Sequence, residues 1–262
     1  MIAWDREEPT ALDELYHCNS KHSPTQIAFV NARTKRQRER TLHDLYEDAR
    51  ERYKTYTAAA CVVLPPPGAE LEMSVGRAIQ TRRSQRTFSQ DAVSVAALGE
   101  LLRYGYGTHE RENGTPTRAV PSGGGLYPLD VYVLQRPGGQ LAEGVYHYHV
   151  GRHVLQYVRP RCTESDLRSA SIYPDLVASA ALVLAVVADM PRVRIKYGER
   201  AYRLALLEAG YVGQSVYLVA NALRLGAVAL DGFYDDRVHA LLGLDGVAQI
   251  SLMMIAIGHP DA

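Results

Sequence analysis

The chain has 262 residues, of which 47% are hydrophobic and 22% charged, enough to bury the core of one full globular domain. Lysine plus arginine equals aspartate plus glutamate at 29 each, which argues against the broad positive surface of a nucleic-acid-binding protein. No apolar run is long enough to span a membrane, and the N-terminus lacks the basic and apolar segments of a signal peptide. We therefore expect a cytoplasmic protein with no membrane and no nucleic-acid partner.

Three consecutive prolines in "LPPPG", residues 64–68, give the strongest internal break, because they can neither continue a helix nor sit centrally in a sheet. We interpret residues 1–70 as an N-terminal arm and residues 71–262 as the main domain. Within the arm, apolar residues recur at steps of three and four, which predicts an amphipathic helix over residues 38–56.

The first half of the main domain alternates helical and extended patterns. "SVGRAIQTRR" (residues 74–83) and "SVAALGELLRYGYG" (94–107) predict helices, the second with Ser94 as N-cap. A strand is predicted over residues 129–134, then a hairpin over 144–158 that turns at Gly151. The apolar run 180–189 is typical of a strand covered on both faces.

The second half opens with one long helix, residues 199–226, which is nearly apolar all round towards its end. Such a helix must be buried, either centrally or at a subunit interface. A strand, a helix and a last strand follow in "AVALDGFYDDRVHALLGL" and "AQISLMMIAIG". The order of elements predicts an α+β fold with a mixed sheet flanked by helices.

Metal binding finds little support in the sequence. Cys18, Cys61 and Cys162 are scattered, so we expect free thiols and no CxxC metal pair. His147 and His149 share one face of a predicted strand and could bind a metal, but no third ligand is obvious. We expect these histidines to be surface positions of the hairpin and the protein to hold no metal.

A basic cluster ends the first helix of the main domain. In "TRRSQRTF" (residues 81–88), Arg82, Arg83 and Arg86 stand with Ser84 within one or two turns. Guanidinium groups bind phosphate in a bidentate manner and stay charged, so the cluster predicts a phosphate site. A surface basic cluster is the alternative.

Three consecutive glycines follow Pro121 and Ser122 in "PSGGGLYP", residues 121–128, which we name the glycine loop. A backbone without side chains can approach a flat ligand, and the Ser122 hydroxyl adds one polar group. The loop matches neither GxxxxGK[ST] nor GxGxxG, and a glycine-rich surface loop is the alternative. A second close backbone approach is predicted at Gly232, in "LDGFYDD".

Lys196 and Tyr197 stand just ahead of the long helix, with Arg194, Arg200 and Arg203 nearby in the chain. A lysine that is crowded by cations and shielded from water is more readily neutral, which would make it a base near neutral pH. The alternative is a solvated charge cluster at the start of a helix.

Taken in order, "RRSQRTF", "PSGGGLYPLDVYVL", "GVYHYHVGRHVL", the segment from "KYGERAYRLALLEAG" to "LRLGAVALDGF", and a final "AIGHP" resemble the SagB-type dehydrogenases. These are FMN-dependent members of the nitroreductase superfamily. The likeness covers residues 74–260, and "LYHCNSKHSP" in the arm resembles an N-terminal motif of the family. The resemblance implies an α+β homodimer with one FMN in each of two clefts between the subunits.

The resemblance also implies roles for individual residues. The residues expected along the FMN phosphate, ribityl chain and ring are Arg82, Arg83, Ser84, Arg86, Pro121, Ser122, Gly123, Gly124 and Gly232. Gly232 would present its N–H near flavin N5, and the glycine loop would be donated across the dimer. The chain lacks the Lys-x-Arg pair that many nitroreductases carry after the last strand, so Arg82 and Arg203 are the candidate phosphate cations.

The implied reaction is the two-electron oxidation of thiazoline or oxazoline rings to thiazole or oxazole in peptide natural-product biosynthesis, with oxygen reoxidising the flavin. Lys196 and Tyr197 would be catalytic, because azoline-oxidising members carry an adjacent lysine and tyrosine at this point. The expected partners are a second copy of the chain, an azoline-bearing peptide, and a cyclodehydratase or synthetase. The alternatives are an NAD(P)H-dependent nitro- or quinone-reductase, a non-catalytic cyclodehydratase partner, and desaturation of an amino-acid Cα–Cβ bond.

Overall fold

The fold is described from a computed structural model over residues 12–21, 53–66, 68, 71–110 and 116–261. Most of the helix predicted over residues 38–56 lies outside these ranges. Its last four residues, 53–56, are described and are not helical, so the prediction is wrong at that end. Within the described ranges, no helix has the length and apolar character needed to cross a membrane.

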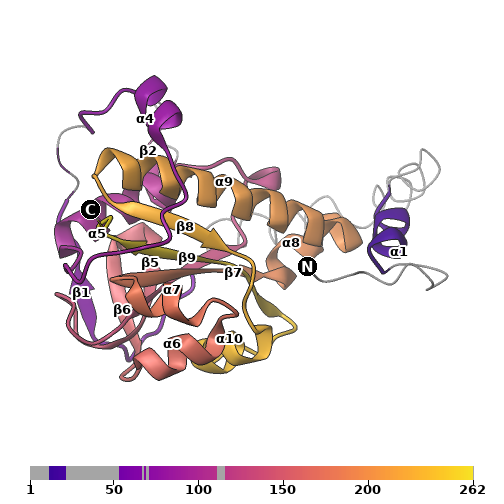
Figure 1. The fold of residues 1–262 in the computed structure, drawn as a ribbon. Helices are drawn as coiled ribbons and strands as arrows, with labels where there is room; N and C mark the ends of the chain where they lie inside the picture. The colour runs from indigo at the N-terminus through magenta and orange to yellow at the C-terminus, as the bar shows by residue number, and fades with distance from the viewer. Residues whose placement is uncertain (1–11, 22–52, 67, 69–70, 111–115, 262) are drawn as a thin grey trace.

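A seven-stranded sheet forms the centre of the molecule, with strand order β1-β6-β5-β4-β7-β9-β8 (Figure 1). Adjacent strands of this sheet all pair in antiparallel fashion. One parallel bridge, between Ser84 and Ala227, joins the β8 edge to the arginine-rich segment of residues 81–88. The strands are β1 (Cys61–Val63), β4 (Leu129–Gln135), β5 (Gly144–His149), β6 (Val154–Arg159), β7 (Leu182–Asp189), β8 (Gly226–Leu230) and β9 (Gln249–Gly258). A separate hairpin pairs β2 (Thr108–Glu110) with β3 (Pro116–Arg118).

Helices cover both faces of the sheet, which confirms the predicted α+β fold (Figure 1). One face packs against α5 (Val95–Tyr106) and α9 (Ala201–Ala222), with α4 (Val75–Thr81) beside α9. The other face packs against α6 (Glu164–Ala170), α7 (Pro174–Ser179) and α10 (Asp235–Leu242). Two further helices, α8 (Met190–Tyr197) and α1 (Leu12–Asn19), lie near the start of α9.

Local sequence signals fix several of these boundaries. The Ser94 hydroxyl accepts a hydrogen bond from the backbone N–H of Ala97, which confirms the predicted N-cap. Ser74 caps α4 in the same way, and Thr163 forms a capping box with Asp166 at the start of α6. The predicted hairpin is also confirmed, since β5 and β6 are joined by a short turn around Gly151.

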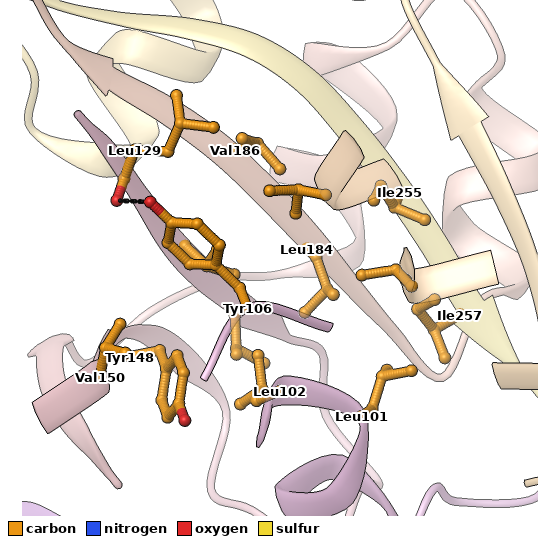
Figure 2. Packing of buried hydrophobic residues seen from close by; sticks show 14 of the residues in the cluster. Leu101, Leu102, Tyr106, Leu129, Tyr148, Val150, Leu184, Val186, Ile255 and Ile257 are labelled. Carbon is orange, nitrogen blue, oxygen red and sulfur yellow. Dashed lines mark hydrogen bonds between the residues drawn. The ribbon is translucent and has the colours of Figure 1, made fainter. Parts of the chain in front are cut away.

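The larger core cluster lies between the sheet and the α5–α9 layer. Figure 2 shows Leu101, Leu102 and Tyr106 of α5 facing apolar side chains of β7 and β9. The predicted strand over 180–189 is buried on both faces, as its continuous apolar run indicates. Helix α9 is buried along one side, but its other side exposes an apolar strip made of Tyr202, Leu206, Leu207 and Tyr211.

Candidate functional site

The glycine loop is a tight, irregular turn leading into β4. Gly124 and Gly125 have φ values of 68° and 66°, in the left-handed region that favours glycine. The backbone N–H of Tyr127 donates to the Ser122 hydroxyl over 2.9 Å, and Arg192 of α8 donates to the Tyr127 carbonyl over 2.9 Å. The loop is therefore held at both ends while Gly124 stays exposed to solvent.

The predicted catalytic pair lies directly against this loop. A Cβ placed on Gly124 would come within 2.7 Å of the Tyr197 hydroxyl and 2.8 Å of Lys196 Nζ. Lys196 Nζ also lies 5.5 Å from the centroid of the Tyr197 ring. Both residues come from the last turn of α8, and burial raises the pKa of Tyr197. The structure thus brings together two features that lie far apart in the chain: the bare backbone of Gly124 and a lysine–tyrosine pair.

A buried glutamate behind the glycine loop was missed by the sequence analysis. The Ser122 hydroxyl donates to Glu208 Oε2 over 2.5 Å, and Glu208 is only 3% exposed. The Tyr106 hydroxyl lies 3.4 Å from Glu208 Oε1. Burial raises the pKa of Glu208 to about 7, against hydrogen bonds from Ser122 and Tyr106 and the charge of Arg118. A signal was present, because Glu208 is the lone acidic residue between positions 200 and 230, in an otherwise apolar helix.

The predicted phosphate cluster is organised around a second residue that the sequence analysis missed, Tyr217 of α9. The Arg82 guanidinium lies 5.1 Å from the Tyr217 ring centroid and 3.5 Å from the Ser84 hydroxyl. The Ser84 hydroxyl lies 3.2 Å from the Tyr217 hydroxyl, which accepts from the backbone N–H of Ala229 over 2.7 Å. Arg82 and Ser84 are thus fixed side by side at the β8 edge of the sheet.

The other two arginines of this cluster are more exposed. Arg83 folds back and donates to the Gln80 and Arg82 carbonyls at the end of α4, and Arg86 lies on the surface. Glu208 and Tyr217 are nine residues apart on α9, which is about 13.5 Å along the helix axis. The glycine loop and the Arg82–Ser84 cluster of one chain therefore face two different sections of α9.

Gly232 lies at the end of β8 under the side chains of Ile172 and Tyr173. A Cβ on Gly232 would come within 2.5 Å of Ile172 and 2.7 Å of Tyr173, so a larger residue here would require these side chains to shift. The Gly232 carbonyl accepts from the Ile172 backbone N–H and the Ser171 hydroxyl. Residues 171–173 thus pack against Gly232 in the single chain, and the approach of its backbone N–H to a ligand stays a prediction.

Arg203 and Arg200 contact the N-terminal helix α1. Arg203 donates to the Ser20 hydroxyl over 2.7 Å and lies 3.2 Å from His17 Nδ1, while Arg200 donates to the Ser20 carbonyl. Tyr16 packs edge-on against Tyr202. Arg200 and Arg203, which the sequence analysis placed around Lys196, thus bind the "LYHCNS" segment of the arm.

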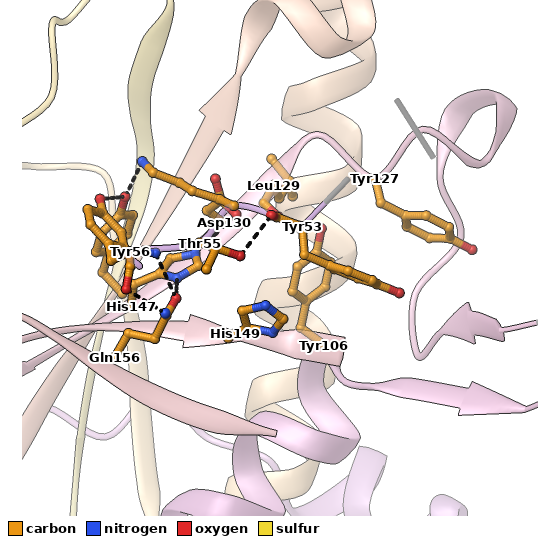
Figure 3. Close-up of polar contacts among 12 residues, drawn as sticks. Tyr53, Thr55, Tyr56, Tyr106, Tyr127, Leu129, Asp130, His147, His149 and Gln156 are labelled. Carbon is orange, nitrogen blue, oxygen red and sulfur yellow. Dashed lines mark hydrogen bonds and ion pairs between the residues drawn. The ribbon is translucent and has the colours of Figure 1, made fainter. Parts of the chain in front are cut away.

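The prediction that His147 and His149 lie on the surface is wrong. They are 1% and 6% exposed, because both faces of β5 are covered. Figure 3 shows His147 between Asp130 and Gln156, at 3.3 Å and 3.2 Å from their oxygens. No group of three or more potential metal ligands occurs among the residues that the structure describes, and the described cysteines are free thiols.

Comparison with known proteins matches residues 79–259 to the nitroreductase family. A Methanocaldococcus jannaschii protein named as a nitroreductase, MJ1384, is 33% identical over 68% of this chain and 86% of its own length. The microcin B17-processing protein McbC of Escherichia coli is 28% identical over 60% of this chain, a match that spans 58% of McbC.

Two solved structures extend these matches. A nitroreductase from Desulfovibrio desulfuricans, solved in complex with FMN, is 25% identical with a TM-score of 0.51 over 73% of this chain and 88% of that chain. A chain of the E. coli microcin synthetase complex McbBCD, solved with a truncated precursor bound, superposes over 98% of this chain and all of that chain. Its TM-score is 0.61 and its identity 21%, a likeness of fold.

Proposed function

The chain belongs to the nitroreductase family, and from that premise we propose that it is an FMN-dependent dehydrogenase that oxidises azoline rings to azoles in peptide natural products. The family makes it an oxidoreductase. The named role of McbC in microcin processing supports the choice of a peptide-borne ring as substrate.

The observation that carries the proposal is the contact between Gly124 and the pair Lys196–Tyr197. The side-chain ends of Lys196 and Tyr197 lie against Gly124, so a substrate ring bound beside them would meet an amine and a phenol, the two groups needed to move a proton from a weakly acidic C–H. A nitro- or quinone-reductase needs no base at this place. The geometry therefore favours a dehydrogenase over the reductase alternative.

The described residues fit the flavin on two sides. The residues that would hold it are Pro121, Ser122, Gly123 and Gly124 along the ring, Gly232 at its edge, and Arg82, Arg83, Ser84 and Arg86 towards the ribityl phosphate, with Arg203 as a further cation. Gly123 supports this fit, because a Cβ there would make a tight contact of 3.3 Å with Leu204, whereas glycine leaves the backbone open to a flat ligand. Bound FMN would supply the two-electron acceptor, and oxygen would reoxidise it.

The tasks left to the chain are orientation and proton removal. Lys196 would take the proton from the ring Cα–H, and Tyr197 would donate a hydrogen bond to the ring heteroatom. The remaining C–H bond gives up its electron pair as hydride, and the ring becomes aromatic. Aromatisation supplies the driving force, so the positions of Lys196 and Tyr197 relative to the ring matter more than further activation of the substrate by other groups.

We further propose that the protein acts as a homodimer with the glycine loop serving the partner's flavin. The apolar strip of α9, residues Tyr202, Leu206, Leu207 and Tyr211, is between 39% and 53% exposed in the single chain. An apolar strip of this size on one helix is typical of an interface between subunits. A cyclodehydratase or synthetase is the proposed further partner, and light scattering of the FMN-loaded protein tests the dimer.

The deciding experiment gives the purified, FMN-loaded protein a synthetic peptide with one thiazoline under air. We expect the peptide to lose two hydrogens by mass spectrometry while oxygen is consumed. Fast bleaching of the flavin by NADPH, with no change in the peptide, would establish the reductase alternative. A protein that binds no FMN yet captures a cyclodehydratase would establish the non-catalytic partner.

A further inference from the structure

Glu208 is a buried carboxyl group that the proposed reaction does not use. Its Oε2 accepts a hydrogen bond from the Ser122 hydroxyl over 2.5 Å, the shortest hydrogen bond between the glycine loop and α9 among the described residues. Ser122 in turn accepts from the backbone N–H of Tyr127 over 2.9 Å. Glu208 is thereby linked to both ends of the turn that contains Gly123 and Gly124.

The core layer also covers Glu208, from the side opposite the exposed surface of the loop. Its neighbours on α9, Ala205, Ala209 and Val212, are at most 2% exposed and belong to the cluster against the sheet. Tyr106 of α5 is 1% exposed and bonds the Leu129 carbonyl of β4 (Figure 2). Movement of the loop would therefore remove the Ser122 donor from Glu208 while leaving the carboxyl group inside the protein.

We propose that the Glu208 carboxylate is a positioning residue: it holds the Ser122 hydroxyl, and through it the glycine loop, in the conformation that receives the flavin. That the ligand is a flavin rests on the proposed function, whereas the hydrogen bond that anchors the loop does not. A hydrogen bond to a carboxylate is roughly twice as strong as one to a neutral carboxyl group. The ionised form of Glu208 thus holds the loop more tightly than the protonated form.

The charged and titratable groups around Glu208 define the direction of the pH effect. Ser122 and Tyr106 face it with hydroxyl groups, and Arg118 of β3 and Arg192 of α8 supply positive charge. Loss of the Ser122 donor from a carboxyl group that stays buried favours its protonated form. The loop is therefore closed at pH 8 and loosens as the pH falls through 7, the region in which Glu208 titrates.

The first test needs no flavin. Hydrogen–deuterium exchange of the loop amides at residues 123–126 is compared at pH 8 between the wild-type protein and Glu208→Gln, both free of FMN. We expect exchange in the variant to be faster by about tenfold, since the amide side chain offers Ser122 only a neutral acceptor. The matched control is Glu199→Gln, which removes an exposed carboxylate near the start of α9 and should leave the loop unchanged.

The second test measures the Kd of FMN between pH 5.5 and 8.5 for the same three proteins. Wild type and Glu199→Gln should bind FMN about tenfold more tightly at the upper end, corresponding to a Glu208 pKa about one unit lower in the complex. Glu208→Gln should match the wild type at pH 5.5 and fall behind it as the pH rises. The titration of the FMN phosphate affects all three proteins equally and cancels in the comparison.

The outcomes separate this proposal from the proposed function. Unchanged loop exchange in Glu208→Gln, or parallel Kd curves for all three proteins, would overturn the anchor. A protein that binds no FMN would overturn the proposed function, while the exchange test still decides the anchor. Should Glu208→Gln not fold, Ser122→Ala removes the same hydrogen bond from the other side and must abolish the pH dependence of loop protection, measured relative to the intrinsic exchange rate at each pH.

Discussion

Two buried carboxyl groups, Asp130 and Glu208, lie close enough together in the fold to act on the same Tyr106 hydroxyl, but their pKa values are shifted in opposite directions. Burial alone would raise the pKa of Asp130, yet the hydrogen bond and charge of His147, with the charges of Lys54 and Arg192, hold it below its ordinary value. Glu208 is as deeply buried, but its two hydroxyl donors and nearby arginines leave its pKa raised to about 7.

The surroundings of the two groups explain this difference. His147 lies between Asp130 and Gln156 (Figure 3). Lys54 donates to the Tyr132 hydroxyl over 2.5 Å, and the Tyr132 ring packs against His147. Asp130 and His147 are buried in the sheet beneath residues 53–56, so the charges of this cluster stabilise one another. Glu208 meets a loop whose far side is exposed at Gly124. A buried carboxylate whose pKa is held down by charged partners indicates a structural role, whereas one that is held by hydroxyl donors beside an open loop indicates a functional role.

The largest expected effect lies on the loop side of this comparison. Lys196→Ala should lower azoline oxidation at least about 100-fold, the range for loss of a general base, while the protein stays yellow. Tyr197→Phe should lower it to a similar degree. Single-turnover oxidation of a thiazoline peptide measures both variants. Near-normal turnover by Lys196→Ala would remove this residue from the mechanism, and loss of FMN would assign it to the flavin site instead.

On the sheet side, Asp130→Asn should destabilise the fold by about 3 kcal/mol, because it leaves His147 and Lys54 without their buried anionic partner. The pKa of Asp130 is lowered in the folded state, so its stabilising contribution is present above about pH 4 and is lost in stronger acid. Urea unfolding at pH 7 and at pH 3 checks both statements. The exposed Asp236→Asn serves as control, and an equal loss there would refute the pairing argument.

Glu208→Gln should have the opposite effect on global stability. The folded pKa is raised to about 7 from an ordinary 4.5, so the folded state loses stability as the pH rises from 4.5 to 7. We expect the variant to be about 3 kcal/mol more stable than the wild type at pH 8, with the difference vanishing below pH 4.5. Thermal unfolding across this range measures it. A variant less stable at pH 8 would show that the fold stabilises the ionised form of Glu208, as it does that of Asp130.

The sequence predicts the elements well because their signals are local. Ser94 before an apolar-periodic run predicts the α5 N-cap, and the run over 180–189 predicts a doubly covered strand. Order along the chain was also enough to identify the glycine loop and the Lys196–Tyr197 pair as separate features. Their contact, however, depends on how α8 packs beside the start of β4, which no local pattern encodes.

The residues that the sequence analysis missed all act through packing. Glu208 stands out in the sequence as the lone acidic residue of its stretch, but its partner, and the role of Tyr217, become visible only when α9 is placed over the loop and the β8 edge. The histidines of β5 were misplaced for the same reason, since alternation along a strand predicts which side chains share a face but not whether helices cover it. Asp130 becomes the partner of His147 only when β4 pairs with β5.

The smallest expected effect tests whether the loop must be bare. Gly124→Ala and Gly138→Ala both place a Cβ on a residue with positive φ, 68° and 87°, and should each destabilise the fold by about 1 kcal/mol. Only at Gly124 does the new methyl group meet other atoms, namely the Tyr197 hydroxyl and Lys196 Nζ. Both atoms are ends of side chains that can move aside, so the methyl group displaces Lys196 and Tyr197 without a further loss of folding stability. We expect kcat/KM for a thiazoline peptide to fall about tenfold in Gly124→Ala, or about 1.4 kcal/mol, and to stay unchanged in Gly138→Ala. Equal activity in the two variants would mean that the positions of Lys196 and Tyr197 beside Gly124 do not matter for the oxidation.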